Sequence, residues 1–185
     1  KNKDTKILKI LDHHQALELV AVFLLDIDLG VISSPKEIDA IGHRVVHGGE
    51  KFASTQVITP EIKAKIKELF PLAPLHNPAN YLGIEVAENI FPHARQIAVF
   101  DTAFHQTMPV ESFRYAIDQK LADQFGIRRY GFHGTSHHYV SRQAAQMSDL
   151  AFDASSWLVA HLGNGSSTCA VENGHSRDTS MGLTP

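Results

Sequence analysis

Two separate stretches of the sequence carry charged side chains that could do chemistry, Arg44 by binding an anion and Asp101 by binding Mg²⁺ or orienting a nucleophile. The stretch GHRVVHGG, residues 42–49, places Arg44 on a strand-like segment, where its rigid guanidinium could bind a carboxylate or a phosphate. The stretch VFDTAFH, residues 99–105, ends a short apolar run with Asp101, a position where ligands gather in open α/β sheets. The residues alone leave two simpler interpretations open: a solvated arginine on an edge strand, and an aspartate that caps a turn.

Histidines beside glycine or asparagine form a second group of candidates. His76 precedes Asn77 and a predicted helix, where it could donate to an anion or simply satisfy the backbone. His133 lies in FHGTSHH, four residues before His137, a spacing that would suit a metal on a helix face. Gly134 and the predicted capping residues place His133 before that helix begins. No HExxH motif or cysteine pair accompanies it, which disfavours a zinc site.

The stretch HLGNGSS, residues 161–167, has the glycine and hydroxyl content of a phosphate-binding loop. It lacks the lysine of a P-loop, and GxSxG, the nucleophile elbow, is absent from the chain. Glycines between two strands could present backbone N–H groups to an anion, although an ordinary hairpin loop would also tolerate them. Together, the five stretches predict a site that surrounds a small, highly charged group from several loops.

The predicted elements explain how such loops could converge. We expect an apolar helix over residues 8–29, strands over residues 38–47 and 95–100, and helices opened by Pro60 and by Pro78. Thr59 and Asn77 are the expected caps of those two helices, and Thr135 or Ser136 the expected cap of a third, after His133. A short helix should end at Gly126, and three strands should follow from Trp157, with Asn173-Gly174 as a hairpin turn. The pattern predicts an α/β layer followed by a second, different sheet.

Composition limits the function classes further. The chain has 185 residues, 43% of them hydrophobic, and a formal net charge of −3, which disfavours broad nucleic-acid binding. Its one cysteine, Cys169, excludes an internal disulfide framework and fits a reducing compartment. We find neither a signal peptide nor an apolar run long enough to span a bilayer, so we expect a cytoplasmic protein without membrane association.

Six longer stretches resemble the acetate kinase family, which also contains propionate and butyrate kinases. They lie between Ile38 and Pro185 and read GHRVVHGGEKF, LAPLHNPAN, VFDTAFHQTMP, RRYGFHGTSHHYV, HLGNGSSTCAVENG and DTSMGLTP. The resemblance implies an α/β fold of the actin, heat-shock chaperone and sugar kinase type, with two duplicated domains that close over ATP. It also implies reversible, in-line transfer of the γ-phosphoryl group of ATP to acetate, giving acetyl phosphate and ADP, with Mg²⁺.

The resemblance assigns expected roles to individual residues. Arg44, His76, Asp101 and His133 would be catalytic, and Asp101 would orient the substrate or hold Mg²⁺. An apolar cup for the acyl methyl group would be formed, together with Arg44, by Val46, Leu75, Phe132 and Pro185. The nucleotide phosphates would be contacted by His161, Leu162, Gly163, Asn164 and Gly165. A carboxylate nucleophile is already ionised at pH 7, so Asp101 is not expected to be a strong general base.

The same resemblance sets expectations for the whole chain. Residues 1–103 would be part of the N-terminal acyl-substrate domain without its first strands, and residues 104–185 the start of the nucleotide-binding domain. Because family members are longer, we expect this chain to be truncated and inactive alone, and the full-length protein to be a homodimer. The alternatives are a propionate or butyrate kinase, a non-catalytic nucleotide-binding module of the same fold and, more distantly, a histidine-rich metal-binding protein.

Overall fold

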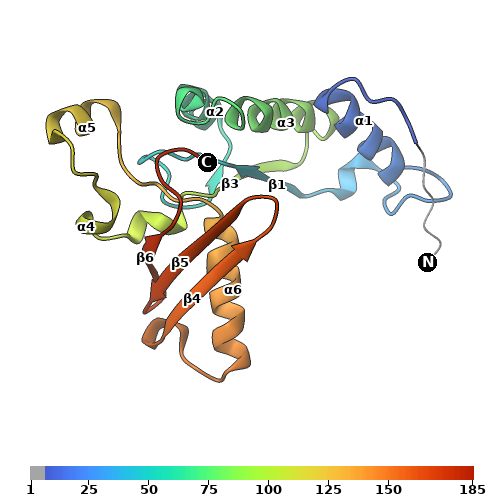
Figure 1. The fold of residues 1–185 in the computed structure, drawn as a ribbon. Coiled ribbons are helices and arrows are strands. Elements are labelled where there is room, and N and C mark those ends of the chain that lie inside the picture. Colours follow the sequence, from blue (N-terminus) through green and yellow to red (C-terminus); the bar gives the residue numbers. More distant parts are fainter. Residues whose placement is uncertain (1–6) are drawn as a thin grey trace.

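Two separate three-stranded sheets organise the chain in a computed structural model, which describes residues 7–185 (Figure 1). The first sheet contains β1 (Ala40–Val45), β2 (Gln56–Val57) and β3 (Arg95–Phe100). The second contains β4 (Ser156–Leu162), β5 (Ser166–Glu172) and β6 (His175–Thr179). The predicted change from an α/β layer to a different sheet is therefore confirmed.

In the first sheet, β3 is central and its carboxyl end lies beside that of β1. The two strands run parallel, with Arg44 opposite Val99 and Val45 opposite Phe100, while β2 pairs antiparallel on the other side of β3. Since parallel strands end at the same edge of a sheet, the residues after Val45 and Phe100 emerge together. This register brings the stretch that contains Arg44 next to Asp101.

Two helices cover one face of this sheet, as Figure 1 shows for α2 (Pro60–Glu68) and α3 (Asn77–Ile90). Thr59 caps α2 as predicted, because its Oγ1 accepts from the backbone N–H of Ile62. Ile66 of α2 is fully buried and packs with Val45, Phe100 and other apolar residues in the main core. Burying such a side chain contributes about 1.5–3 kcal/mol.

The prediction that Asn77 caps α3 is wrong. The residue at the cap position is His76, and it makes no side-chain capping bond. Asn77 is the first helical residue, and its amide is buried against His47, accepting from the His47 N–H and donating to the His47 carbonyl, both at 3.0 Å. The amide therefore ties α3 to the segment after β1 instead of closing its own helix.

The first helix is shorter than predicted, because α1 runs only from His13 to Leu24. Asp12 caps its start, and the chain turns directly after its end. Asp26 accepts from the N–H groups of Asp28 and Leu29, and the Leu24 carbonyl accepts from two later N–H groups. An aspartate that bonds its own backbone in this way competes with helix formation, which the apolar pattern did not reveal.

The second sheet is an antiparallel meander with a helix packed against β4. Asn173 and Gly174 both have positive φ, 51° and 79°, as the predicted hairpin turn requires. The helix is α6 (Gly134–Met147), and its cap residue is His133, which makes no side-chain capping bond. The prediction of Thr135 or Ser136 as the cap is wrong, since both lie inside the first turn of α6.

Short elements lie between β3 and β4, among them α4 (Val110–Phe113) and α5 (Gln119–Phe125), which ends at Gly126 in the left-handed conformation as predicted. The same stretch holds 3-10 turns at Phe104–Thr107 and Phe152–Ala154, and two further 3-10 turns, Pro35–Glu37 and Phe70–Leu72, precede β1 and α3. Within residues 7–185 no helix has both the length and the apolar character needed to cross a bilayer.

Candidate active site

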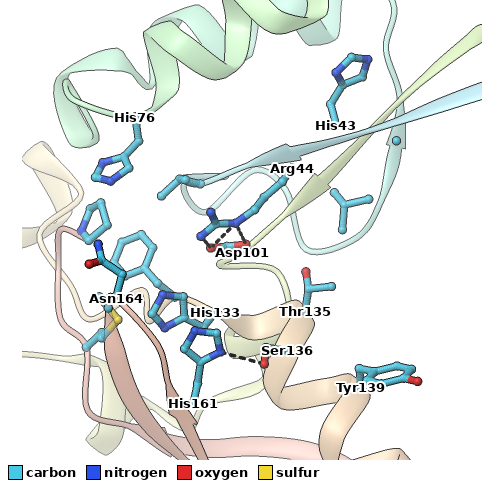
Figure 2. A pocket seen from close by; sticks show the side chains of 17 residues that line it. His43, Arg44, His76, Asp101, His133, Thr135, Ser136, Tyr139, His161 and Asn164 are labelled. Atoms are coloured by element: carbon cyan, nitrogen blue, oxygen red, sulfur yellow. Dashed lines mark hydrogen bonds and ion pairs between the residues drawn. The ribbon is translucent and has the colours of Figure 1, made fainter. Parts of the chain in front are cut away.

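A cleft of about 880 Å³ is lined by residues from both sheets and from the start of α6 (Figure 2). Most residues of the predicted site line it. They are Arg44, Val46, His76, Asp101, Phe132, His133, His161, Asn164, Gly165 and Pro185. Three other predicted residues, Leu75, Leu162 and Gly163, are not among the lining residues, and the side chains of Leu75 and Leu162 are 86% and 80% exposed.

Arg44 and Asp101 form a two-point ion pair on the side of the cleft made by the first sheet. Arg44 Nε donates to Oδ1 at 3.0 Å, and Nη2 donates to Oδ2 at 2.5 Å. The Asp101 side chain is 2% exposed and that of Arg44 is 61% exposed. Hydrogen bonding to Asp101 raises the pKa of Arg44, so the guanidinium stays charged. The edge of the guanidinium that Asp101 does not occupy faces the cleft (Figure 2). Arg44 does lie exposed on an edge strand, as its simpler interpretation had it, but its guanidinium is also paired with Asp101, whose side chain is engaged by this ion pair.

His133 enters the cleft from the junction between the two sheets, held by an unusual backbone. Its φ is 57°, a left-handed conformation that costs a residue with a Cβ roughly 1–2 kcal/mol. The next residue, Gly134, donates its N–H to the Asp101 carbonyl at 2.9 Å, and a Cβ there would collide with that oxygen. The His-Gly pair is therefore what brings the His133 ring close to Asp101.

Burial lowers the pKa of His133, and the neighbouring His161 lowers it further. The two rings are stacked, with centroids 4.0 Å apart and planes 20° apart (Figure 2). His161 Nδ1 lies 2.9 Å from the Ser136 hydroxyl, which fixes the ring against α6. At neutral pH His133 therefore offers an uncharged imidazole to the cleft, in contrast to the permanent charge of Arg44.

The loop between β4 and β5 is closed by its own backbone. Gly163 donates its N–H to the Gly165 carbonyl at 3.1 Å, so this amide is already engaged within the loop. Asn164 and Gly165 reach the cleft, and Gly165 lies beside the His133 ring. The loop thus faces the histidines with an asparagine amide and glycine backbone, groups that suit the oxygens of an anion.

An apolar patch forms another part of the wall. Val46 and Phe132 are almost fully buried, 2% and 1% exposed, and they pack around Tyr130. Met181 packs against the same cluster and lines the cleft, although sequence reasoning missed it. Such a patch beside a cation can accept a small molecule with a charged end and a short apolar end.

Sequence reasoning also missed several polar residues of the cleft: His43, Thr135, Ser136 and Tyr139. His43 neighbours Arg44 on β1 and bonds Gln96 through Nε2 at 2.7 Å. The other three follow His133 at the start of α6, where the stretch GTSHHY was interpreted only as a helix start. Their position directly after His133 was the available signal.

The described residues do not form a preassembled metal site. Among residues 7–185 no group of three or more His, Cys, Asp or Glu side chains is arranged to hold a metal ion. Asp101 is the carboxylate that lines the cleft, and both of its oxygens accept from Arg44. A carboxylate engaged in this way does not fit a direct Mg²⁺ ligand while the ion pair is intact, and we assign no step to the metal.

These features define an α/β enzyme-type cleft between two sheets, with a fixed cation, a pair of stacked histidine rings and a glycine loop. The chain belongs to the Acetokinase family, whose model matches residues 1–185. It is 56% identical over 183 residues to the acetate kinase of Ectopseudomonas mendocina, covering 99% of this chain and 45% of that protein. It is 62% identical over 148 residues to the acetate kinase of Stutzerimonas stutzeri, covering 80% and 38%.

Solved structures agree with the sequence comparison. The crystal structure of Porphyromonas gingivalis acetate kinase matches with a TM-score of 0.88 and 50% identity, over 94% of this chain and 44% of that one. A propionate kinase from Francisella tularensis matches with a TM-score of 0.89 and 48% identity, over 97% and 45%. The predicted fold is confirmed, and the chain spans less than half the length of these relatives.

Proposed function

We propose that this cleft takes part in the reversible, in-line transfer of a phosphoryl group from ATP to acetate, which gives acetyl phosphate and ADP. The observation that carries the proposal is the meeting of Arg44, Asp101 and His133 in one cleft beside the glycine loop. Phosphoryl transfer needs little covalent help from a protein but requires positioning and stabilisation of charge on the equatorial oxygens.

Arg44 supplies the positive charge in this mechanism. Asp101 occupies the edge that carries Nε, which leaves the Nη1 edge to bind the carboxylate and the developing phosphoryl charge. Asp101 acts as a positioning residue, because a buried carboxylate fixes the plane of the guanidinium. A preorganised donor of this kind contributes roughly 3–4 kcal/mol to transition-state stabilisation.

His133 supplies a second donor from the opposite wall. Because burial lowers its pKa, the ring stabilises the transferring group as a neutral hydrogen-bond donor. No strong base is required, since acetate is already ionised at neutral pH. His76, at the start of α3, lines the same cleft and would donate to the same anion.

The two substrates would occupy different parts of the cleft. The acyl methyl group would contact Val46 and Phe132, with Pro185 nearby, and Leu75 could join this cup only after moving from its exposed position. The nucleotide phosphates would approach the loop that runs from His161 through Leu162, Gly163 and Asn164 to Gly165. In that loop the cleft is reached by His161, Asn164 and Gly165.

Propionate is the second candidate acceptor, and a specific observation favours it: the similarity to a propionate kinase structure. An apolar pocket discriminates one methylene by only about 1–3 kcal/mol, so overlapping use of the two acids is expected. We also propose that residues 1–103 and 104–185 belong to separate domains, and that the complete protein is a cytoplasmic homodimer. The Mg²⁺ that such kinases use would neutralise charge on the nucleotide phosphates.

We further propose that the 185-residue chain is inactive by itself, because it spans less than half of its relatives. The test joins this chain to the remainder of Porphyromonas gingivalis acetate kinase, in place of the segment it matches, giving a chimeric kinase. We expect acetyl phosphate, trapped as its hydroxamate, from the chimeric kinase with ATP and acetate, and none from the chain alone.

Two results would contradict these proposals. A folded chimeric kinase that binds ATP but forms no acyl phosphate would instead indicate a non-catalytic nucleotide-binding module. Robust acetyl phosphate formation by the 185-residue chain would show that the cleft is complete without further polypeptide.

A further inference from the structure

A buried serine hydroxyl lies between two histidine rings directly behind the cleft. Ser167 Oγ of β5 is 2.9 Å from His133 Nδ1 and 2.8 Å from His137 Nε2. Ser167 is 3% exposed and His137 is fully buried. The His133 ring, in contrast, lines the cleft, so this hydroxyl connects a cleft residue to a histidine inside the protein.

Because the Ser167 hydroxyl has one proton, the tautomers of the His133 and His137 rings depend on each other. Ser167 can donate to only one ring nitrogen, and it must then accept an N–H from the other. Burial lowers the pKa of His133 and brings the pKa of His137 to about 4, so both rings are neutral at pH 7. Each neutral ring carries one N–H, and the direction of the relay therefore determines both tautomers together.

The surroundings of His137 Nδ1 indicate which ring donates to Ser167 and which ring accepts from it. This atom is buried and has no hydrogen-bond partner among the described residues. A buried N–H without an acceptor is rarer in proteins than an unused acceptor. The favoured His137 tautomer therefore leaves Nδ1 bare and carries its proton on Nε2, where it donates to Ser167.

We propose that Ser167 is a positioning residue that accepts from His137 and donates to His133 Nδ1, which holds His133 in its Nε2–H tautomer. His133 Nε2 lies on the side of Gly165, where a Cβ would stand 3.5 Å from it, and Gly165 lines the cleft. Phosphoryl and carboxylate oxygens only accept hydrogen bonds. The opposite tautomer would turn a lone pair toward them, and only this catalytic consequence rests on the proposed function.

The tautomer can be measured without any enzymatic activity. In the ¹⁵N-histidine-labelled 185-residue chain, long-range ¹H–¹⁵N spectra at pH 7.5 should show His133 protonated on Nε2, its signals being identified by their loss in His133→Gln. Ser167→Ala should shift His133 toward a mixture of tautomers. Ser166→Ala, at the exposed neighbouring serine, is the matched control and should leave the His133 spectrum unchanged.

A second pair of variants tests the donor behind the serine. His137→Gln retains an N–H near the position of Nε2 and should preserve the His133 tautomer, whereas His137→Leu should lose it. An Nδ1–H tautomer in the unsubstituted chain would overturn the proposal even if no variant folds. So would a His133 spectrum that Ser167→Ala leaves unchanged.

Kinetics of the chimeric kinase test the consequence for phosphoryl transfer. Ser167→Ala should lower kcat about five- to tenfold, the size of one lost hydrogen bond, with little change in KM for acetate. Ser148→Ala, at an exposed serine after α6, should leave both constants unchanged. If the unsubstituted chimeric kinase is inactive while the spectra show the Nε2–H tautomer, the proposed function fails and the assignment of Ser167 stands.

Discussion

The two walls of the cleft offer hydrogen-bond donors to an anion in different ways. One, which we call the ion-pair wall, consists of Arg44 and Asp101 at the ends of β1 and β3. The other, the histidine wall, consists of His133 and His161, each with a ring nitrogen within hydrogen-bond distance of a serine hydroxyl. The ion-pair wall carries a fixed charge, whereas the histidine wall contains His133, a donor whose pKa is lowered by burial.

The pKa shifts of the two walls have opposite consequences. Hydrogen bonding to a buried carboxylate raises the pKa of Arg44, so the cation persists at every physiological pH. Burial lowers the pKa of His133, so the neutral ring persists down to mildly acidic pH. A cleft with one compensated cation and a neutral donor at His133 can bind an anion and still release it, as the proposed reversible reaction would require.

The largest effect should come from the ion-pair wall. In the chimeric kinase, Arg44→Ala should lower kcat/KM for acetate about 10³-fold, because it removes the cation and leaves Asp101 unpaired. Arg44→Lys should remain at least about tenfold impaired, since an ammonium cannot reproduce the two-point geometry. Steady-state hydroxamate assays measure both variants.

The matched control is Arg95→Ala, an exposed arginine at the opposite end of β3, which should behave as the unsubstituted protein. Full activity of Arg44→Lys would show that charge alone suffices. The distinction between the two walls would then lose its geometric basis.

A smaller loss of activity is expected from a substitution in the histidine wall. His133→Ala should lower kcat about 10²-fold while KM for acetate changes little, because the ring acts mainly on the transition state. His175→Ala, an exposed histidine of β6, serves as the control. If His133→Ala raised KM and left kcat intact, His133 would be a substrate-binding residue, and only the ion-pair wall would act on the transition state.

The histidine wall was harder to predict from the sequence than the ion-pair wall. The apolar run of β3 ending in Asp101 and the strand that carries Arg44 are local patterns, and parallel pairing then brings them together. The hairpin at Asn173-Gly174 and the cap at Thr59 were predictable for the same reason, because their chemistry depends on neighbouring residues.

The sequence could not show to which distant group a polar side chain would hydrogen-bond. Asn77 has the composition of a cap, yet its amide bonds His47, 30 residues earlier. Ser167 was interpreted only as part of a glycine-rich loop, and its bond to His133 spans 34 residues. The predicted roles of the site residues remain predictions, although most of those residues do line one cleft.

The smallest effect concerns the buried histidine that supports the histidine wall. His105 Nε2 donates to the Phe132 carbonyl at 3.0 Å, and burial brings its pKa to about 4. The folded protein therefore keeps the ring neutral, while the unfolded chain protonates it near pH 6.5. The contribution of this neutral ring to the free energy of unfolding is fully present above pH 6.5 and is lost as pH falls toward 4, by at most about 1.4 kcal/mol per pH unit.

Urea unfolding of the chimeric kinase at pH 7.5, 6 and 5 measures how steeply the free energy of unfolding depends on pH. His105→Gln should reduce this slope, and the exposed-site control His175→Gln should not. An unchanged slope in His105→Gln would mean that burial of this ring does not carry the pH dependence.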